Sequence, residues 1–265
     1  MKKIKKKAKR IFYLSLTVLA LMIAINVHVA AGNGHSWYCV HVKDHTQPKC
    51  DKSFEFIKEY DGYYIDEKHG DDNQDKVIYL TFDAGYENGN VEKILNVLKE
   101  QNVPAAFFVL GNLITKNQSL IARMFNEGHL VCNHTYTHKS MVNKSFDEFK
   151  NELAALENAC SQMIGCEIDK YYRPPEGRFD EESLKYAQEM GYKTVFWSFA
   201  YADWDNNSQM SAEKAKAKIL ENIHNGEVML LHPTSSTNAE ILEEIIVTLK
   251  SQGYRFGTLD ELCTQ

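Results

Sequence analysis

The sequence has 265 residues, 44% of them hydrophobic, and a formal net charge of −6, so it is long and apolar enough for one buried core with extensions. Seven of its 30 Lys and Arg residues fall within the first ten positions, and no Asp or Glu precedes Gly32, which leaves the rest of the chain strongly acidic. An acidic surface argues against nucleic acid as a partner, and any polyanionic substrate would need local recognition.

Residues 1–31 are typical of an export signal. A basic start is followed by an apolar run from Ile11 to Val27, and small residues follow at Ala30 and Ala31. The run is roughly 17 residues long, near the lower limit for crossing a bilayer, so cleavage after Ala31 and retention as a membrane anchor are both open. In either case we expect a secreted or membrane-anchored, extracytoplasmic protein that meets the membrane only through this segment.

Six cysteines in an exported chain permit disulfides, and short loops make Cys39–Cys50 and Cys160–Cys166 the candidate pairs. Free buried cysteines are also common, so both outcomes are open. Residues 32–75 show no sustained hydrophobic period and end in a polar, acidic stretch. We expect them to be an N-terminal extension packed on a domain that spans residues 76–265.

From Lys76 onward, short apolar runs rich in β-formers alternate with segments of helical period. Six such strand–helix pairs predict an α/β fold with a parallel sheet covered by helices. Such a series can wind as an open sheet or close into a barrel. The predicted pairs are 76–83 with 91–101, 105–111 with 118–128, 130–134 with 146–163, 171–177 with 181–191, 193–203 with 212–226, and 227–234 with 239–253.

Polar residues suited to catalysis follow five of the predicted strands. Ligands of parallel α/β folds bind at the carboxyl ends of the strands, where the connecting loops converge. Packing alone does not readily produce such a distribution, so we expect these side chains to share a site. The residues are Asp83, His134, His138, Arg173, Asp203 and His232.

Some of these residues also have a purely structural interpretation. Asp83 could cap the helix expected near Val91, although Asn90 is the better cap. The spacing of His134 and His138 places two imidazoles on one face of a helical turn, where a metal can bind both. A histidine pair can equally make ordinary polar contacts, so spacing alone leaves the metal open.

The remaining candidates have alternatives too. Arg173 precedes two prolines and could be a surface residue on a rigid turn. His232, after an apolar run, is either a buried hydrogen-bonded histidine or a catalytic acid. Trp197 and Trp204 either fill space or provide flat faces for sugar rings.

Five segments, in order, resemble the motifs of the NodB-homology polysaccharide deacetylases, carbohydrate esterase family 4. They are TFDAG (81–85), NHTYTH (133–138), RPPEG (173–177), WSFAYADW (197–204) and LLH (230–232). The resemblance covers roughly residues 76–262. It implies a distorted (β/α) barrel with an N-terminal extension and a hydrolase that removes N-acetyl groups from polysaccharide.

The resemblance also implies roles. Asp83 would be the general base, held charged and oriented by Arg173. His134 and His138 would bind a divalent metal, expected to be zinc, that polarises the acetamide carbonyl and its attacking water. His232 would protonate the departing amine, with Asp203 keeping its imidazolium form available.

On the substrate side, the resemblance implies that a backbone N–H near Glu176 helps to stabilise the oxyanion. Trp197, Trp204 and Tyr86 are the further expected substrate contacts. Two positions depart from the family pattern. Ala84 stands where most members have an Asp as third metal ligand, and Glu176 stands where an aromatic residue is common. A methyl group cannot coordinate a metal, so these motifs supply two protein ligands.

Within the family, TFDAGYENG and the extension resemble the spore-cortex subgroup that deacetylates N-acetylmuramic acid on the way to muramic δ-lactam. Members of that subgroup also tend to lack the second Asp. This resemblance implies a peptidoglycan glycan strand as partner, and action after a muramoyl amidase, in the cell wall or spore cortex. Two alternatives stay open: deacetylation of N-acetylglucosamine or chitin-type chains, and a non-catalytic glycan-binding pseudoenzyme, which Ala84 motivates.

Overall fold

The structure is a computed structural model and describes residues 34–264. Residues 36–264 belong to one compact unit. The predicted export segment, residues 1–31, lies outside the described residues. Within residues 34–264, no helix is long and apolar enough to cross a membrane.

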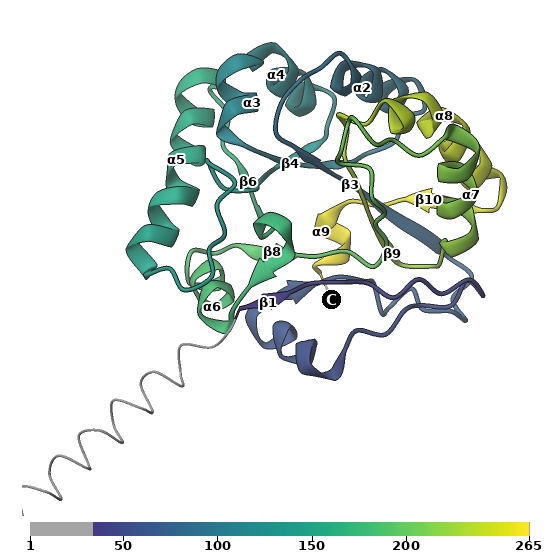
Figure 1. Cartoon of the computed structure of the whole chain (residues 1–265), viewed down its shortest axis with the longest axis horizontal. Coiled ribbons are helices and arrows are strands. Elements are labelled where there is room, and N and C mark those ends of the chain that lie inside the picture. Colours follow the sequence, from purple (N-terminus) through teal and green to yellow (C-terminus); the bar gives the residue numbers. More distant parts are fainter. Residues whose placement is uncertain (1–33, 265) are drawn as a thin grey trace, which may run out of the picture. The chain divides into compact units, whose positions relative to one another are not determined.

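The centre of this unit is an eight-stranded sheet in which every strand pair is parallel. Its order is β10-β3-β4-β5-β6-β8-β2, with β9 also paired to β3, and it curls into a half barrel (Figure 1). The predicted (β/α) barrel-like fold is therefore confirmed. The strands are β2 (Gly62–Tyr63), β3 (Lys76–Ala84), β4 (Ala106–Val109), β5 (Leu130–Asn133), β6 (Asp169–Tyr172), β8 (Lys193–Val195), β9 (Glu227–Leu231) and β10 (Tyr254–Phe256).

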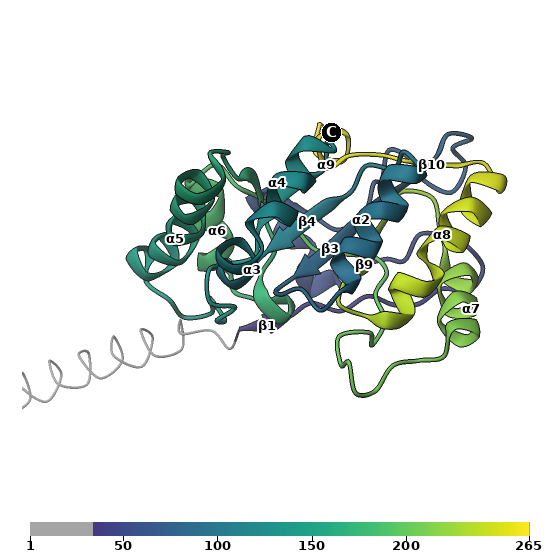
Figure 2. The same cartoon turned by 90° about the horizontal axis from the view of Figure 1, so that it is seen from above.

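The main helices cover the outer face of the curled sheet, as Figures 1 and 2 show. They form where apolar residues recur at helical spacing; α2, for example, buries Val91, Ile94, Leu95 and Leu98. The helices are η1 (Lys52–Tyr60), α2 (Asn90–Glu100), α3 (Gly111–Lys116), α4 (Gln118–Asn126), α5 (Phe146–Ile164), η2 (Pro175–Gly177), α6 (Glu181–Glu189), α7 (Ala212–Asn222), α8 (Ser236–Ser251) and α9 (Leu259–Leu262). Two further short strands are β1 (His35–Ser36) and β7 (Arg178–Phe179).

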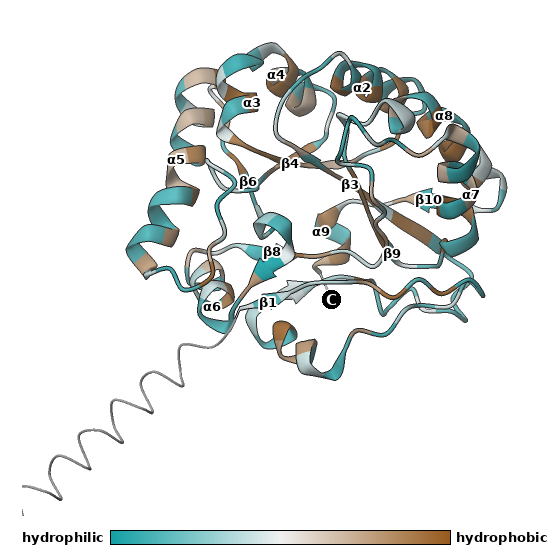
Figure 3. Cartoon of the chain, in the orientation of Figure 1, coloured by the Kyte–Doolittle hydropathy of each residue, from teal (hydrophilic) through white to brown (hydrophobic). Residues whose placement is uncertain are grey.

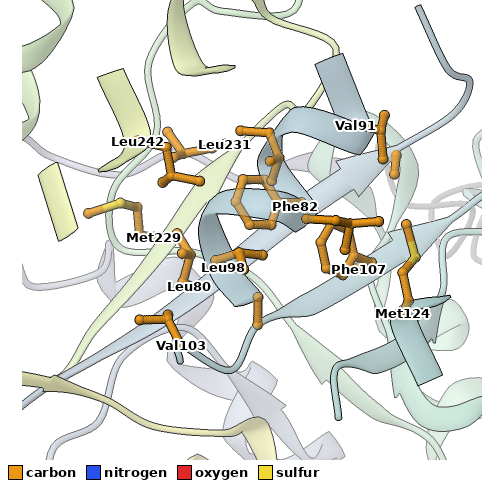
Figure 4. Close-up of a cluster of buried hydrophobic side chains, with 14 of the residues drawn as sticks. Leu80, Phe82, Val91, Leu98, Val103, Phe107, Met124, Met229, Leu231 and Leu242 are labelled. Carbon is orange, nitrogen blue, oxygen red and sulfur yellow. The ribbon is translucent and has the colours of Figure 1, made fainter. Parts of the chain in front are cut away.

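The largest core lies between the sheet and these helices. Strand β3 alternates its side chains between two apolar clusters: Leu80 and Phe82 face the helices, and Val77 and Tyr79 face the other side. Figure 4 shows Phe82 beside Phe107, and their rings stack with centroids 5.1 Å apart. Apolar colour concentrates on the central strands in Figure 3. A strand buried on both faces is a rigid base for whatever follows its carboxyl end.

The extension contains elements that the sequence pattern did not predict. Strand β2 pairs with β8 and ends the sheet, and η1 buries Phe54 and Ile57. Trp37 donates from its backbone N–H to the Gly177 carbonyl and from its ring Nε1–H to the Trp197 carbonyl, at 2.8 and 2.9 Å. Residues 36–75 thus belong to the same compact unit as the rest of the barrel.

Replacing Trp37 with Ala is expected to lower the free energy of unfolding by about 3–5 kcal/mol, the usual effect of deleting a large buried aromatic ring. The Trp37 ring is 5% exposed and stacks on Phe196 with centroids 4.5 Å apart. Denaturant unfolding measures the change. Trp204→Ala is the matched control, because Trp204 is 61% exposed and should lose little stability. Equal losses for the two variants would contradict the packing role of Trp37.

Neither candidate pair forms a disulfide. All six cysteines, each within residues 34–264, are free, which is one of the two outcomes that the sequence left open. In the second pair, Cys160 lies on α5 and is buried in the core, whereas Cys166 lies beyond the end of that helix. One local expectation is wrong: Asn90 does not cap α2. Gly89 takes the cap position in a left-handed conformation, and the Asn90 amide donates to the Thr234 carbonyl at 3.0 Å.

Candidate active site

A cavity of about 700 Å³ opens at the carboxyl ends of the strands. It contains eight of the ten site residues predicted from sequence, and the other two, Arg173 and Asp203, bind side chains that line it. Curling of the sheet therefore brings all ten predicted residues to one place. The eight lining residues are Asp83, Tyr86, His134, His138, Glu176, Trp197, Trp204 and His232.

Asp83, the second-to-last residue of strand β3, is held by a buried arginine. Arg173 is fully buried and donates from Nη1 to the Asp83 Oδ1 at 2.8 Å. Its other nitrogens donate to the carbonyls of Val195 and Phe196, and its guanidinium lies 4.1 Å from the centroid of the Phe108 ring. Each guanidinium nitrogen thus donates one hydrogen bond, and together these contacts fix the direction of the Asp83 carboxylate.

The electrostatic surroundings keep Asp83 ionised. Burial alone would raise the pKa of Asp83, but electrostatic interaction with His134, Arg173 and His232 outweighs burial and lowers this pKa. Burial lowers the pKa of His134 to about 4, so that imidazole is neutral at pH 7. Arg173 is then the permanent positive charge that stabilises the Asp83 carboxylate.

The two histidines lie on a loop that follows β5, and the predicted helical turn is wrong. Thr135 and His138 have positive φ angles of 69° and 61°, which a right-handed helix does not allow. Side chains stabilise the turn: Asn133 Oδ1 accepts from the Thr135 N–H at 2.9 Å, and Thr135 Oγ1 accepts from the His138 N–H at 3.0 Å. The two imidazole rings still meet, with centroids 5.0 Å apart.

The donor atoms present suit a divalent metal. The Arg173 carbonyl accepts a hydrogen bond from His134 Nδ1 at 2.8 Å, and this bond leaves Nε2 of the neutral ring free as a ligand. That Nε2 lies 3.5 Å from Asp83 Oδ2. Ala84 is fully buried and supplies no donor. Among residues 34–264, no group of three His, Cys, Asp or Glu side chains could hold a metal, and the two imidazoles are the candidate ligands.

His232, directly after β9, forms the second charged pair. Asp203 is 1% exposed; its Oδ1 lies 2.7 Å from His232 Nδ1, and its Oδ2 accepts from the His232 N–H at 2.8 Å. Burial alone would lower the pKa of His232, but the hydrogen bond and charge of Asp203, with the charge of Asp83, raise it. His232 can therefore carry a proton while Nδ1 stays bound to Asp203 and Nε2 is left for a ligand.

Asn238 binds both members of this pair, and no sequence pattern predicted it. Its amide donates to Asp203 Oδ2 at 2.6 Å and to the His232 carbonyl at 3.1 Å. Asn238 lies in the first turn of α8, where Ser235 caps the helix by accepting from the Asn238 N–H. A polar residue in a capped first turn is ordinary, so nothing in the sequence distinguished it.

The cavity walls combine a strained turn with aromatic rings. Glu176 lies on η2 with a φ of 57°, a backbone conformation that costs energy for a residue other than glycine and often marks functional sites. Trp204 lies at the rim, its ring centroid 6.2 Å from that of His232. Tyr86, also exposed, accepts a hydrogen bond from Asn206 through its hydroxyl. Exposed ring faces beside the charged pairs provide surfaces on which sugar rings can pack.

Comparisons with known proteins agree with this geometry. The family described as polysaccharide deacetylase matches residues 70–195. The peptidoglycan-N-acetylmuramic acid deacetylase PdaA of Bacillus subtilis is 39% identical over 220 residues, covering 83% of this chain and 82% of the relative. A peptidoglycan-N-acetylglucosamine deacetylase of Bacillus cereus is 35% identical over 189 residues, covering 70% of this chain and 67% of the relative. The solved structure of Bacillus subtilis PdaA, described as a family 4 carbohydrate esterase, has a TM-score of 0.81 at 37% identity and covers 87% of this chain and 97% of its own.

Proposed function

This chain belongs to the polysaccharide deacetylases of carbohydrate esterase family 4, and we propose that it removes the acetyl group from N-acetylmuramic acid in peptidoglycan. As a family member it is a hydrolase of N-acetyl groups on polysaccharide, and peptidoglycan is the substrate named for its relatives. One observation carries the assignment of chemistry. Two charged pairs, Asp83 with Arg173 and His232 with Asp203, meet at one cavity, and they favour opposite protonation states.

In this proposal Asp83 is the general base. Its ionised carboxylate accepts a proton from a water molecule whose oxygen attacks the carbonyl carbon of the acetamide. Arg173 keeps the carboxylate charged and aimed by its 2.8 Å bond to Oδ1. A backbone N–H near Glu176 donates to the oxygen of the tetrahedral intermediate, where negative charge develops.

His232 completes the reaction as the general acid. The carbon–nitrogen bond of the intermediate breaks, and His232 gives its proton to the leaving nitrogen, so that the products are acetate and a free amine. Asp203 favours the protonated imidazole and holds Nδ1, which directs the other nitrogen toward substrate. The rings of Trp197, Trp204 and Tyr86 then contact the sugar rings of the glycan strand.

His134 and His138 would hold a divalent metal, with zinc as the proposed ion. When bound, such an ion polarises the acetamide carbonyl and lowers the pKa of the attacking water. Two imidazoles hold an ion less tightly than three protein ligands, so water or substrate must complete its coordination. We therefore expect the metal to exchange more readily than in sites that have a third protein ligand.

One observation supports muramic acid as the sugar. The relative named for N-acetylmuramic acid matches a larger share of this chain, 83%, than the 70% matched by the N-acetylglucosamine enzyme. An amine freed beside the lactyl carboxylate of muramic acid can close to a δ-lactam only if no peptide occupies that carboxylate. We propose that a muramoyl amidase acts first, and that the protein works outside the cytoplasm, in the cell wall or spore cortex.

The test is product analysis on peptidoglycan with and without prior amidase treatment. We expect the purified protein to release acetate from the amidase-treated glycan, and mass spectrometry of digested product to show the loss on muramic acid. A chelator should lower the rate, and added zinc should restore it. Loss of acetyl groups from glucosamine alone would overturn the muramic acid assignment. Glycan binding without acetate release, with zinc present, would instead indicate the pseudoenzyme.

A further inference from the structure

A side chain of α5 binds the loop that carries the two histidines. Glu152 Oε2 accepts hydrogen bonds from the backbone N–H groups of Tyr136 and Thr137, at 3.1 and 3.2 Å. Its other oxygen, Oε1, accepts from the Thr137 hydroxyl. One carboxylate thus satisfies three donors on the two residues between the left-handed positions at Thr135 and His138. Successive N–H groups in such a turn form a concave site that favours an anion.

The two histidines depend on this loop to different degrees. His134 is 3% exposed and its ring is tied to the Arg173 carbonyl. His138 is exposed, and within residues 34–264 its ring makes no hydrogen bond, only the contact with the ring of His134. The position of the His138 ring therefore depends on its own backbone, which Thr135 and Glu152 hold.

Glu152 is itself rigidly placed. It lies between Phe149 and Leu153, both fully buried, on a helix whose start is capped reciprocally by Ser145 and Glu148. The Leu153 carbonyl also accepts from the Asn133 side chain at 3.1 Å. Helix α5 therefore binds the loop at Asn133, just before its first residue, and again at its centre through Glu152. Glu152 forms no salt bridge among the residues that the structure describes, so its charge is directed at the loop donors.

We propose that Glu152 is a positioning residue that holds His138 beside His134 and so sets the affinity of the site for a divalent metal. The proposal deepens the function proposed above and rests on its metal-binding histidines. Removing the carboxylate leaves two backbone N–H groups and one hydroxyl without their acceptor, and the loop can then relax toward solvent. Outer partners of metal ligands typically change metal affinity by about 10- to 100-fold when they are removed.

The experiment measures zinc binding to the full chain by calorimetry, and cobalt binding by its visible absorption. We expect Glu152→Ala to weaken zinc affinity by about 10- to 100-fold and to change the cobalt spectrum. Glu152→Gln should weaken zinc affinity less, because its amide oxygen still accepts from the loop. At saturating zinc, the rate of acetate release by both variants should approach that of the wild type.

Glu148→Gln is the matched control. Glu148 lies one turn earlier on α5, beside the same surface cavity as Glu152, but it binds Ser145 and Lys144 and does not contact the loop. A glutamine at this position can still accept from the Ser145 N–H in the cap, so the zinc affinity of Glu148→Gln should equal that of the wild type. Circular dichroism and thermal unfolding show whether each variant is folded, and the isosteric Glu152→Gln provides the answer if Glu152→Ala does not fold.

The outcomes separate this inference from the proposed function. If wild type and both Glu152 variants bind zinc equally, the positioning role is wrong and the deacetylase proposal is unaffected. If the wild type releases no acetate but Glu152→Ala weakens zinc binding, the positioning role stands and the proposed reaction fails. If the wild type binds no zinc, the positioning role is overturned, and acetate release then decides separately whether the hydrolysis stands.

Discussion

Asp83→Asn is expected to lower the rate of acetate release by about 10² or more, the usual contribution of a general base. An amide has nearly the shape of a carboxylate but cannot take a proton from water at neutral pH. Arg173 would keep its bonds to the carbonyls of Val195 and Phe196, so we expect the fold to persist. Steady-state acetate release on amidase-treated peptidoglycan measures the effect.

Two controls sharpen this prediction. Denaturant unfolding of Asp83→Asn measures its stability, and an unchanged free energy of unfolding is expected if the loss of rate is chemical. His232→Ala should also lose about 10² or more, because it removes the proposed acid. Since base and acid act in one reaction, the double variant should lose far less than the product of the two single losses. Wild-type rates in both single variants would refute the roles assigned to the two charged pairs.

Asp203→Asn should have the second large effect, seen in the dependence of rate on pH. His232 must be protonated to act as an acid, so activity falls as pH rises through its pKa. Asp203 raises that pKa by accepting a hydrogen bond and by its charge. Removing the charge lowers the pKa of His232, so the alkaline limb of the kcat/KM profile moves to lower pH. Each unit of movement lowers activity on the alkaline side about tenfold.

The profile distinguishes this effect from a general loss of structure. Asp205→Asn is the matched control: Asp205 lies two residues away on the same loop and is exposed, and among the described residues its carboxylate accepts only from the nearby Asn207 N–H. Its alkaline limb should coincide with that of the wild type. If the limb of Asp203→Asn stays in place while the rate drops at every pH, Asp203 supports the loop but does not set the protonation of His232.

The order of the elements and the residue types of the site followed from the sequence. Apolar runs such as 76–83 alternate with segments of helical period such as 91–101, and this alternation is set locally by side-chain chemistry. Because parallel strands end at one edge of a sheet, residues directly after those runs were expected to meet. The cavity contains or borders all six of these strand-end residues.

Short and irregular elements escaped prediction for a physical reason. Strand β2 has two residues, too few to show a hydrophobic period. Helix η1 has a 3₁₀ conformation with about three residues per turn, so its apolar residues do not follow the period of 3.6 that predicts an α-helix. Their position depends on aromatic packing around Trp37, whose partners Phe179 and Phe196 lie far along the chain. The histidine loop was predicted as a helical turn because spacing alone cannot reveal the positive φ angles at Thr135 and His138.

By itself, then, the sequence determined the α/β alternation and the strand ends that carry the chemistry, and its motifs pointed to the family whose barrel-like fold the structure has. Tertiary structure decided which side chains bind one another: Arg173 reaches Asp83 across 90 residues of chain, and Asp203 reaches His232 across 29. It also placed Asn238 and Glu152 beside the site, although their positions on α8 and α5 show no distinguishing pattern in the sequence. Local pattern records burial and period, whereas these pairings depend on how the curled sheet and its loops bring distant backbone segments within hydrogen-bonding distance.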